Sequence, residues 1–285
     1  MCTAARVPPL LVCTRLVEPA ENLKCCARHG AWCGVSVHGI APSLKVEDLT
    51  FAYPGGEYVL EGVNLEVEGP GLITVLGPNG AGKTTFFKLI LGLLKPLRGR
   101  VYLNGEDVTG DPARAGAHAS FVPQLSAVRR DLPATGVEVV EWALKGYRGE
   151  ERRRRALEIL RSVGAEEFAG KRFSSMSGGQ LQRVLIAKAL ARGTPILVLD
   201  EPFSGIDPRG REEIADLLSK LAESRMVLVS THDPVLTLKR SRLIVVFNRG
   251  VRAVGTPDEV YELEMLRKAY GPGVLVIEKC LHVIG

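Results

Sequence analysis

The chain contains the glycine-rich run Gly77-Pro78-Asn79-Gly80-Ala81-Gly82-Lys83-Thr84-Thr85. It fits the pattern G-x-x-x-x-G-K-[ST] of the phosphate-binding loop, and it lies between an apolar strand-like segment and a helical pattern, as that motif requires. Glycines let the backbone curl so that its N–H groups point at phosphate oxygens, and the helix start adds a positive end. The run therefore predicts a nucleoside triphosphate site. In it, Lys83 reaches the β- and γ-phosphates and the Thr84 hydroxyl ligates Mg²⁺.

Composition indicates a globular chain with enough apolar residues for a sizeable core. Of the 285 residues, 46% are hydrophobic and 24% are charged, and the net charge is +5. This charge is too mild to indicate a nucleic acid partner. No apolar run approaches the ~18 residues that a membrane-spanning helix needs, so we expect any membrane role to come through a partner.

Residues 1–43 are expected to lie outside the fold, as a disordered extension or the product of an early start codon. Prolines interrupt this segment, and its apolar pattern is irregular. Its cysteines fit no paired zinc-ligand spacing, and a cytosolic protein should not rely on disulfides. Five of the six cysteines of the chain lie here: Cys2, Cys13, Cys25, Cys26 and Cys33.

From Leu44 onward the pattern indicates alternating strands and helices. Leu44–Tyr53 alternates apolar and polar residues as a half-buried strand does, and Tyr58–Val67 predicts a second strand with a break at Gly62. Helical spacing dominates the middle of the chain, including Thr135–Gly146. The sequence predicts an α/β core interrupted by an inserted helical subdomain at about residues 126–178.

Two carboxylates follow the buried, continuously apolar strand predicted at Ile196–Leu199. In such sheets this strand end lies next to the phosphate-binding loop. Asp200 can hold Mg²⁺, directly or through water, and Glu201 can act as general base toward the attacking water. A strand ending in solvated acids is common by itself, but the pairing with the loop favours a catalytic site.

A second anion-binding helix start is predicted at Ser177-Gly178-Gly179-Gln180. Ser177 fits an N-cap, and the two glycines leave bare N–H groups at the first turn. Since Lys83 already belongs to a complete phosphate cradle, a second cradle suggests a ligand shared between two copies of the chain.

Taken together, these motifs resemble the ABC-type ATPases, the nucleotide-binding subunits of ATP-binding cassette systems. The resemblance runs from about Leu44 to the C-terminus, so that 44–285 would form one ABC ATPase domain. It implies a P-loop NTPase (RecA-like) core with an N-terminal antiparallel β subdomain and the inserted α-helical subdomain. The motif order is also that of the family: phosphate loop, Gln124, Ser177–Gln180, Asp200-Glu201, Asp207, His232.

The resemblance implies roles for several more residues. Tyr53 matches the aromatic residue that stacks on adenine, and Gln124 matches the glutamine that touches Mg²⁺ and the attacking water and senses the membrane partner. Asp207 matches the loop that crosses a dimer interface, and His232 matches the switch histidine on the γ-phosphate. Ser177 and Gly179 would act on ATP held by the opposite subunit, so that two ATP molecules join a homodimer.

The segment around Gln124 and the chain's tail resemble the zinc/manganese uptake branch of this family. Leu132 departs from that branch's pattern, in which Phe is usual, and Gly136 precedes Val137. Membership implies permease partners, an extracytoplasmic solute-binding protein reached through them, and a location at the cytoplasmic face of the membrane.

Three alternatives stay open from the sequence. The chain could be an importer subunit for a different substrate or a soluble ABC ATPase of an assembly process, such as iron–sulfur cluster building. It could also be a regulatory ATP-binding module without turnover, but Glu201 and His232 argue against that reading. No Asn-Lys-x-Asp base-reading motif supports a GTPase.

Overall fold

The computed structural model describes residues 41–232, 235–260, 274–277 and 280–283. The first described strand, β1, begins at Ser43. The interpretation of residues 1–40, including the cysteine-rich stretch and its excluded zinc site, lies outside these residues.

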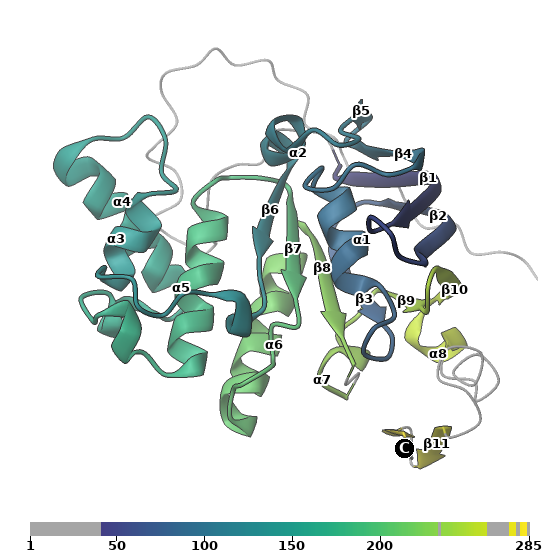
Figure 1. Ribbon diagram of the computed structural model, residues 1–285. Helices are drawn as coiled ribbons and strands as arrows, with labels where there is room; N and C mark the ends of the chain where they lie inside the picture. The colour runs from purple at the N-terminus through teal and green to yellow at the C-terminus, as the bar shows by residue number, and fades with distance from the viewer. Residues whose placement is uncertain (1–40, 233–234, 261–273, 278–279, 284–285) are drawn as a thin grey trace, which may run out of the picture. The chain divides into compact units, whose positions relative to one another are not determined.

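A six-stranded sheet in the order β10-β9-β3-β8-β7-β6 forms the centre of the fold (Figure 1). Its neighbours pair in parallel, except that β10 is antiparallel to β9. Most of its strands are continuously apolar, because parallel strands are covered on both faces. The bounds are β3 Gly71–Leu76, β6 Ala119–Val122, β7 Ile196–Asp200, β8 Met226–Thr231, β9 Leu243–Phe247 and β10 Val251–Gly255.

A second, four-stranded sheet in the order β2-β1-β4-β5 is wholly antiparallel, which confirms the expected N-terminal β subdomain. Its strands are β1 Ser43–Ala52, β2 Tyr58–Glu68, β4 Arg98–Leu103 and β5 Glu106–Asp107. The expected break at Gly62 is wrong: β2 continues through it. Gly62 instead has a φ of +56° and lies where the register with β1 shifts, as in a β-bulge.

Helices connect and cover the sheets. Their bounds are α1 Lys83–Ile90, α2 Pro112–His118, α3 Gly136–Glu141, α4 Gly149–Ser162, α5 Gly178–Leu190, α6 Pro208–Ala222, α7 Val235–Leu238 and α8 Pro257–Val260. Single 3₁₀ turns are η1 Leu125–Ala127, η2 Glu166–Phe168 and η3 Phe173–Ser175, and a separate hairpin pairs β11 Val274–Ile277 with β12 Cys280–Val283.

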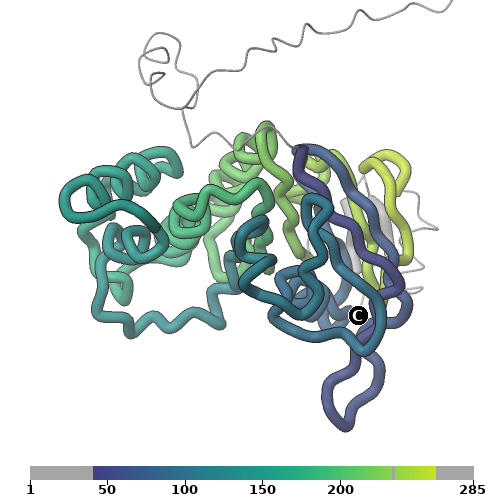
Figure 2. The backbone as a smooth tube through the Cα atoms, turned by 90° about the horizontal axis from the view of Figure 1, so that it is seen from above, coloured from purple at the N-terminus to yellow at the C-terminus, as the bar shows by residue number. Residues whose placement is uncertain are grey.

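Between β6 and β7 the described elements are all helical, and α3, α4 and α5 gather on the side away from β1 and β2 (Figure 2). The helix predicted over Thr135–Gly146 is shorter than expected, because α3 ends at Glu141. The Leu144 N–H bonds to the Glu141 carbonyl three residues back, so the chain tightens into a turn there. A capping box between Thr135 and Glu138 fixes the start of α3.

The central sheet separates two apolar cores. Successive side chains of a strand point to opposite faces of the sheet, so they pack alternately into one core and the other. In β8, Met226 and Leu228 join the core that also contains α1 and the antiparallel sheet, whereas Val227 and Val229 join the core formed with α3, α4, α5 and α6. Phe86 of α1 is fully buried in the first core, with its ring centroid 5.0 Å from that of Phe247 in β9. The helix that follows the phosphate loop is thereby packed between both sheets.

Replacing Phe86 by Ala should lower the free energy of unfolding by about 3–5 kcal/mol, because the cavity lies where α1 packs against β9. The measurement is the urea midpoint followed by circular dichroism. Leu93→Ala is the control, since Leu93 is 53% exposed. A Phe86→Ala midpoint equal to that of the control would contradict this packing account.

Candidate functional site

The phosphate loop is shaped by close contact with the β9–β10 hairpin. A Cβ atom at Gly77 would lie 2.1 Å from the Phe247 carbonyl oxygen, so only glycine fits there. The Arg249 N–H donates to the Ala81 carbonyl at 2.9 Å. Gly80 and Gly82 have φ values of +78° and +94°, a conformation that glycine adopts readily. The loop thus takes its curled form from its own glycines and from the hairpin.

Lys83 lies at the start of α1 with its ammonium turned onto the loop. It donates to the carbonyls of Gly77 at 2.7 Å and Pro78 at 3.0 Å, and its nitrogen lies 3.4 Å from Glu201 Oε1. Burial lowers the pKa of the Lys83 ammonium, and the nearby Glu201 and Asp200 carboxylates oppose this shift. A charge this well buried is suited to pair with an anionic ligand.

Asp200, at the end of β7, is buried and accepts hydrogen bonds at both oxygens. The Thr84 hydroxyl donates to Oδ2 at 2.7 Å, and the Ser230 hydroxyl donates to Oδ1 at 2.5 Å. A hydroxyl and a carboxylate oxygen facing each other are suitable ligands for Mg²⁺, which proteins usually hold with one or two carboxylates beside substrate phosphates. Within the described ranges there is no cluster of three or more His, Cys, Asp or Glu side chains able to hold a metal ion alone.

Glu201 and His232 are brought together at the same sheet edge. His232 Nδ1 lies 2.9 Å from Glu201 Oε2, and the Glu201 side chain is 13% exposed against 55% for His232. Glu201 has a φ of +46°, and its backbone N–H donates to Ser230 Oγ at 2.9 Å. Sequence reasoning missed Ser230. The signal was the hydroxyl pair Ser230-Thr231, which ends an otherwise apolar strand directly before His232.

Gln124 and Tyr53 flank this cluster. Gln124 follows β6, and since Val122 pairs with Leu199 of β7, it lies at the same edge as Asp200. Tyr53 is 43% exposed, and its hydroxyl lies 3.3 Å from Thr85 Oγ1. Its ring stands edge-on to that of Phe51, with centroids 5.0 Å apart, which leaves a face available for stacking.

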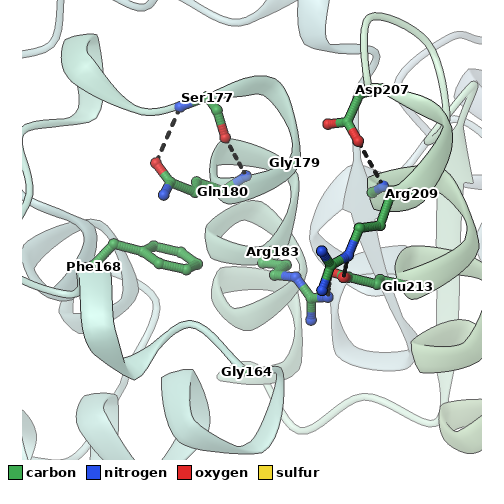
Figure 3. Close-up of a pocket in the computed structure, with 10 residues that line it drawn as sticks. Gly164, Phe168, Ser177, Gly179, Gln180, Arg183, Asp207, Arg209 and Glu213 are labelled. Carbon is green, nitrogen blue, oxygen red and sulfur yellow. Dashed lines mark hydrogen bonds and ion pairs between the residues drawn. The ribbon is translucent and has the colours of Figure 1, made fainter.

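The second predicted anion cradle borders a separate cavity of about 410 Å³ (Figure 3). The helix starts of α5 and α6 converge there. Ser177 caps α5, its hydroxyl accepting from Gln180 N and its own N–H donating to Gln180 Oε1, and Asp207 caps α6 by accepting from Gly210 N. The lining residues are Gly164, Phe168, Ser177, Gly179, Gln180, Arg183, Asp207, Arg209, Gly210 and Glu213, none of them from the phosphate loop.

Gly178 is absent from that lining because it faces the loop before α6. A Cβ atom there would lie 2.4 Å from the Gly205 carbonyl oxygen. The loops that carry Ser177 and Asp207 are therefore packed backbone to backbone. The predicted site residues form two groups, one around Lys83 and one around Ser177.

Comparison with known proteins identifies the family. The model of the ABC transporter family matches residues 60–204. The chain belongs to the ABC transporter family. As a member of it, the protein binds ATP and is an ATPase.

Several relatives of the chain are named as ATP-binding proteins of transport systems, two of them for manganese and zinc. The manganese transport system ATP-binding protein MntA of Synechocystis sp. is 34% identical over 80% of this chain and 90% of its own length. The zinc import ATP-binding protein ZnuC of Pseudomonas fluorescens is 37% identical over 76% of this chain and 77% of its own. The energy-coupling factor transporter ATP-binding protein EcfA of Methanocaldococcus jannaschii is 35% identical over 79% of this chain and 84% of its own length.

Solved structures of similar chains agree with the fold. The dimeric, post-hydrolysis structure of the ATP-binding cassette MJ0796 with ADP and Pi has a TM-score of 0.67 and 33% identity, covering 75% of this chain and 98% of that one. CbiO1 of Clostridium perfringens, part of the transporter complex cbiONQ, has a TM-score of 0.69 and 28% identity. The match covers 79% of this chain and 92% of CbiO1. Among the described residues of this ABC protein, no helix has the length and apolar character to cross a membrane.

Replacing Lys83 by Ala should weaken ATP binding at least about tenfold, because hydrogen bonds to charged groups contribute about 1.5–3 kcal/mol. Fluorescent-nucleotide titration measures it. Lys88→Ala, a change in the last turn of the same helix, is the control. Equal affinities for the wild type and Lys83→Ala would remove Lys83 from the binding site.

Proposed function

We propose that the chain is the ATP-hydrolysing subunit of an importer for a divalent metal ion such as zinc or manganese. The observation that carries the catalytic part is the meeting of Lys83, Thr84, Asp200, Glu201 and His232 at one sheet edge. The metal assignment is supported by the manganese and zinc transport relatives, which align over most of this ABC domain. Residues 44–285, with the helical insertion at about 126–178, make up that domain in this proposal.

In the reaction we propose, each group performs one task. The loop Gly77–Thr85 and Lys83 bind the phosphates, and Tyr53 stacks on the adenine. Mg²⁺, when bound, would neutralise charge on the β- and γ-phosphate oxygens, held by Thr84, Asp200 and Gln124. Glu201 takes a proton from the attacking water, a contribution of about 10²–10⁴-fold.

His232 supports Glu201 in this scheme. Its Nδ1 contacts the Glu201 oxygen that is not paired with Lys83, so the carboxylate is held from both sides. A histidine so placed can donate its other ring nitrogen toward the γ-phosphate once ATP is bound. His232 is 55% exposed, so its ring is accessible from the side of the site that faces solvent.

The cavity at Ser177 is proposed to bind the γ-phosphate of ATP held by a second copy. Two helix starts, Arg183 and Arg209 line it and offer N–H donors to an anion, although both arginines pair with Glu213. No residue of the phosphate loop of the same chain lines it. The dimeric structures of MJ0796 support a homodimer. Hydrolysis and phosphate release remove the shared charge, so the dimer opens and the motion drives the permease.

The proposed partners are integral-membrane permease subunits and, through them, an extracytoplasmic solute-binding protein, which places the chain at the cytoplasmic face of the membrane. A second candidate is import of another substrate, because EcfA matches this chain about as well as the metal-transport relatives do.

Glu201→Gln should keep ATP binding but lower hydrolysis by about 10²–10⁴-fold, because an amide cannot accept the proton. The variant should also accumulate an ATP-bound dimer, measured by light scattering. Glu223→Gln, at the exposed C-terminus of α6, is the matched control. A Glu201→Gln protein that stays monomeric with ATP would contradict the shared-site proposal.

Deleting the gene should lower the zinc or manganese content of cells grown at limiting metal, measured by elemental analysis. Wild-type protein should restore the content, and Glu201→Gln should not, because import depends on turnover. Unchanged metal contents beside a lost uptake of another solute would favour the second candidate.

A further inference from the structure

The hydroxyl of Ser230 occupies a position in the site that none of the proposed roles explains. Ser230 is fully buried in β8, whose preceding residues Met226–Val229 are all apolar. It pairs in register with Asp200 of β7 on one side and with Val75 of β3 on the other. Ser230 therefore lies between the strand that leads into the phosphate loop and the strand that ends in the acids.

The directions of the two hydrogen bonds at Ser230 follow from their partners. The Glu201 backbone N–H is a donor only, so at 2.9 Å the Ser230 oxygen accepts from it. The hydroxyl proton is then free to donate to Asp200 Oδ1, at 2.5 Å. A hydroxyl that donates to a carboxylate oxygen makes a charge-assisted hydrogen bond, which is about twice as strong as one between neutral groups.

This arrangement fixes which oxygen of Asp200 is available to a cation. Ser230 occupies Oδ1, and Oδ2 faces the Thr84 hydroxyl at 2.7 Å. If the Thr84 hydroxyl turns to another ligand, the bond from Ser230 still prevents rotation of the carboxylate. Oδ2 then stays directed at the phosphate-loop side of the site.

The same hydroxyl holds the backbone of Glu201 in an uncommon conformation. Glu201 has a φ of +46°, in the left-handed region that is unfavourable for a residue with a Cβ. Its carbonyl accepts from Ser204 N at 3.1 Å, closing the turn that follows β7. Its N–H would be left without this partner if the Ser230 hydroxyl were removed.

We propose that Ser230 is a positioning residue for hydrolysis, which orients the Asp200 carboxylate toward Mg²⁺ and fixes the peptide that aims Glu201. The inference rests on the roles proposed above for Asp200 and Glu201. Ser230 itself touches neither nucleotide nor cation in this scheme and acts only through these two residues.

The test compares Ser230→Ala with the wild type in nucleotide binding and turnover. Affinity for a fluorescent ADP analogue in EDTA should be unchanged, because the phosphate loop is intact. The Mg²⁺ concentration that half-saturates binding should rise about 10–100-fold, as typically follows loss of a group that orients a metal ligand. The kcat should fall by a similar factor of about 10–100, with little change in KM for ATP at saturating Mg²⁺.

Ser120→Ala is the matched control. Ser120 is also buried in the central sheet, in β6, and its hydroxyl lies 2.7 Å from Thr194 Oγ1, away from the site. This variant should keep wild-type Mg²⁺ dependence even if it lowers the unfolding midpoint. Ser230→Thr, which retains the hydroxyl, should recover most of the Mg²⁺ affinity and turnover.

Wild-type Mg²⁺ dependence and kcat in Ser230→Ala would overturn the inference, as would an equal loss of both in Ser120→Ala. Asp200→Asn separates this failure from failure of the proposed function. If Asp200→Asn impairs Mg²⁺ dependence and Ser230→Ala does not, only the positioning role is wrong. If Asp200→Asn also behaves as wild type, the proposed site itself is wrong, and the inference with it.

Discussion

The in-register parallel pairing of β3, β8 and β7 is the constraint on which the site depends. Leu76 pairs with Thr231, and Ser230 pairs with Asp200, so the three strands end at nearly the same level. The residues that come next in each segment must then be neighbours, although more than a hundred positions separate the phosphate loop from Glu201. A slip of one residue would turn Ser230 and Asp200 to opposite faces of the sheet.

This edge concentrates charge where solvent is scarce. The Lys83 and Glu201 side chains are 7% and 13% exposed, and Asp200 is 3% exposed as a residue. Removing ions from water is unfavourable unless partners compensate. Here the Gly77 and Pro78 carbonyls and Glu201 compensate Lys83, and the Thr84 and Ser230 hydroxyls compensate Asp200. The Gly77 and Pro78 carbonyls that accept from Lys83 belong to the phosphate loop itself, so the loop holds this ammonium among its own oxygens.

The sequence contains enough to predict most of this fold, and it names in advance the residues that the structure brings together around Lys83 and around Ser177. Short motifs with fixed spacing, such as the phosphate loop and the Ser177 helix start, encode their geometry locally, through glycine conformations and capping. Ser230 could not be assigned in this way because its partners lie 30 positions away and become neighbours only through strand register. The helix α2 was not predicted, although Asp111 before Pro112 is a recognisable cap and first-turn signal.

Contact between Gly77 and the Phe247 carbonyl has a consequence for where the nucleotide-binding unit ends. The family match spans residues 60–204 and includes the phosphate loop, Ser177–Gln180 and Asp200-Glu201. The backbone that contacts the loop belongs to β9 and the turn after it, at Phe247 and Arg249, some 40 residues beyond that match. A fragment that retained those motifs but stopped before Leu243 would keep the sequence of the loop. It would lose the backbone contacts of Phe247 and Arg249 that help to hold the loop in its curled form.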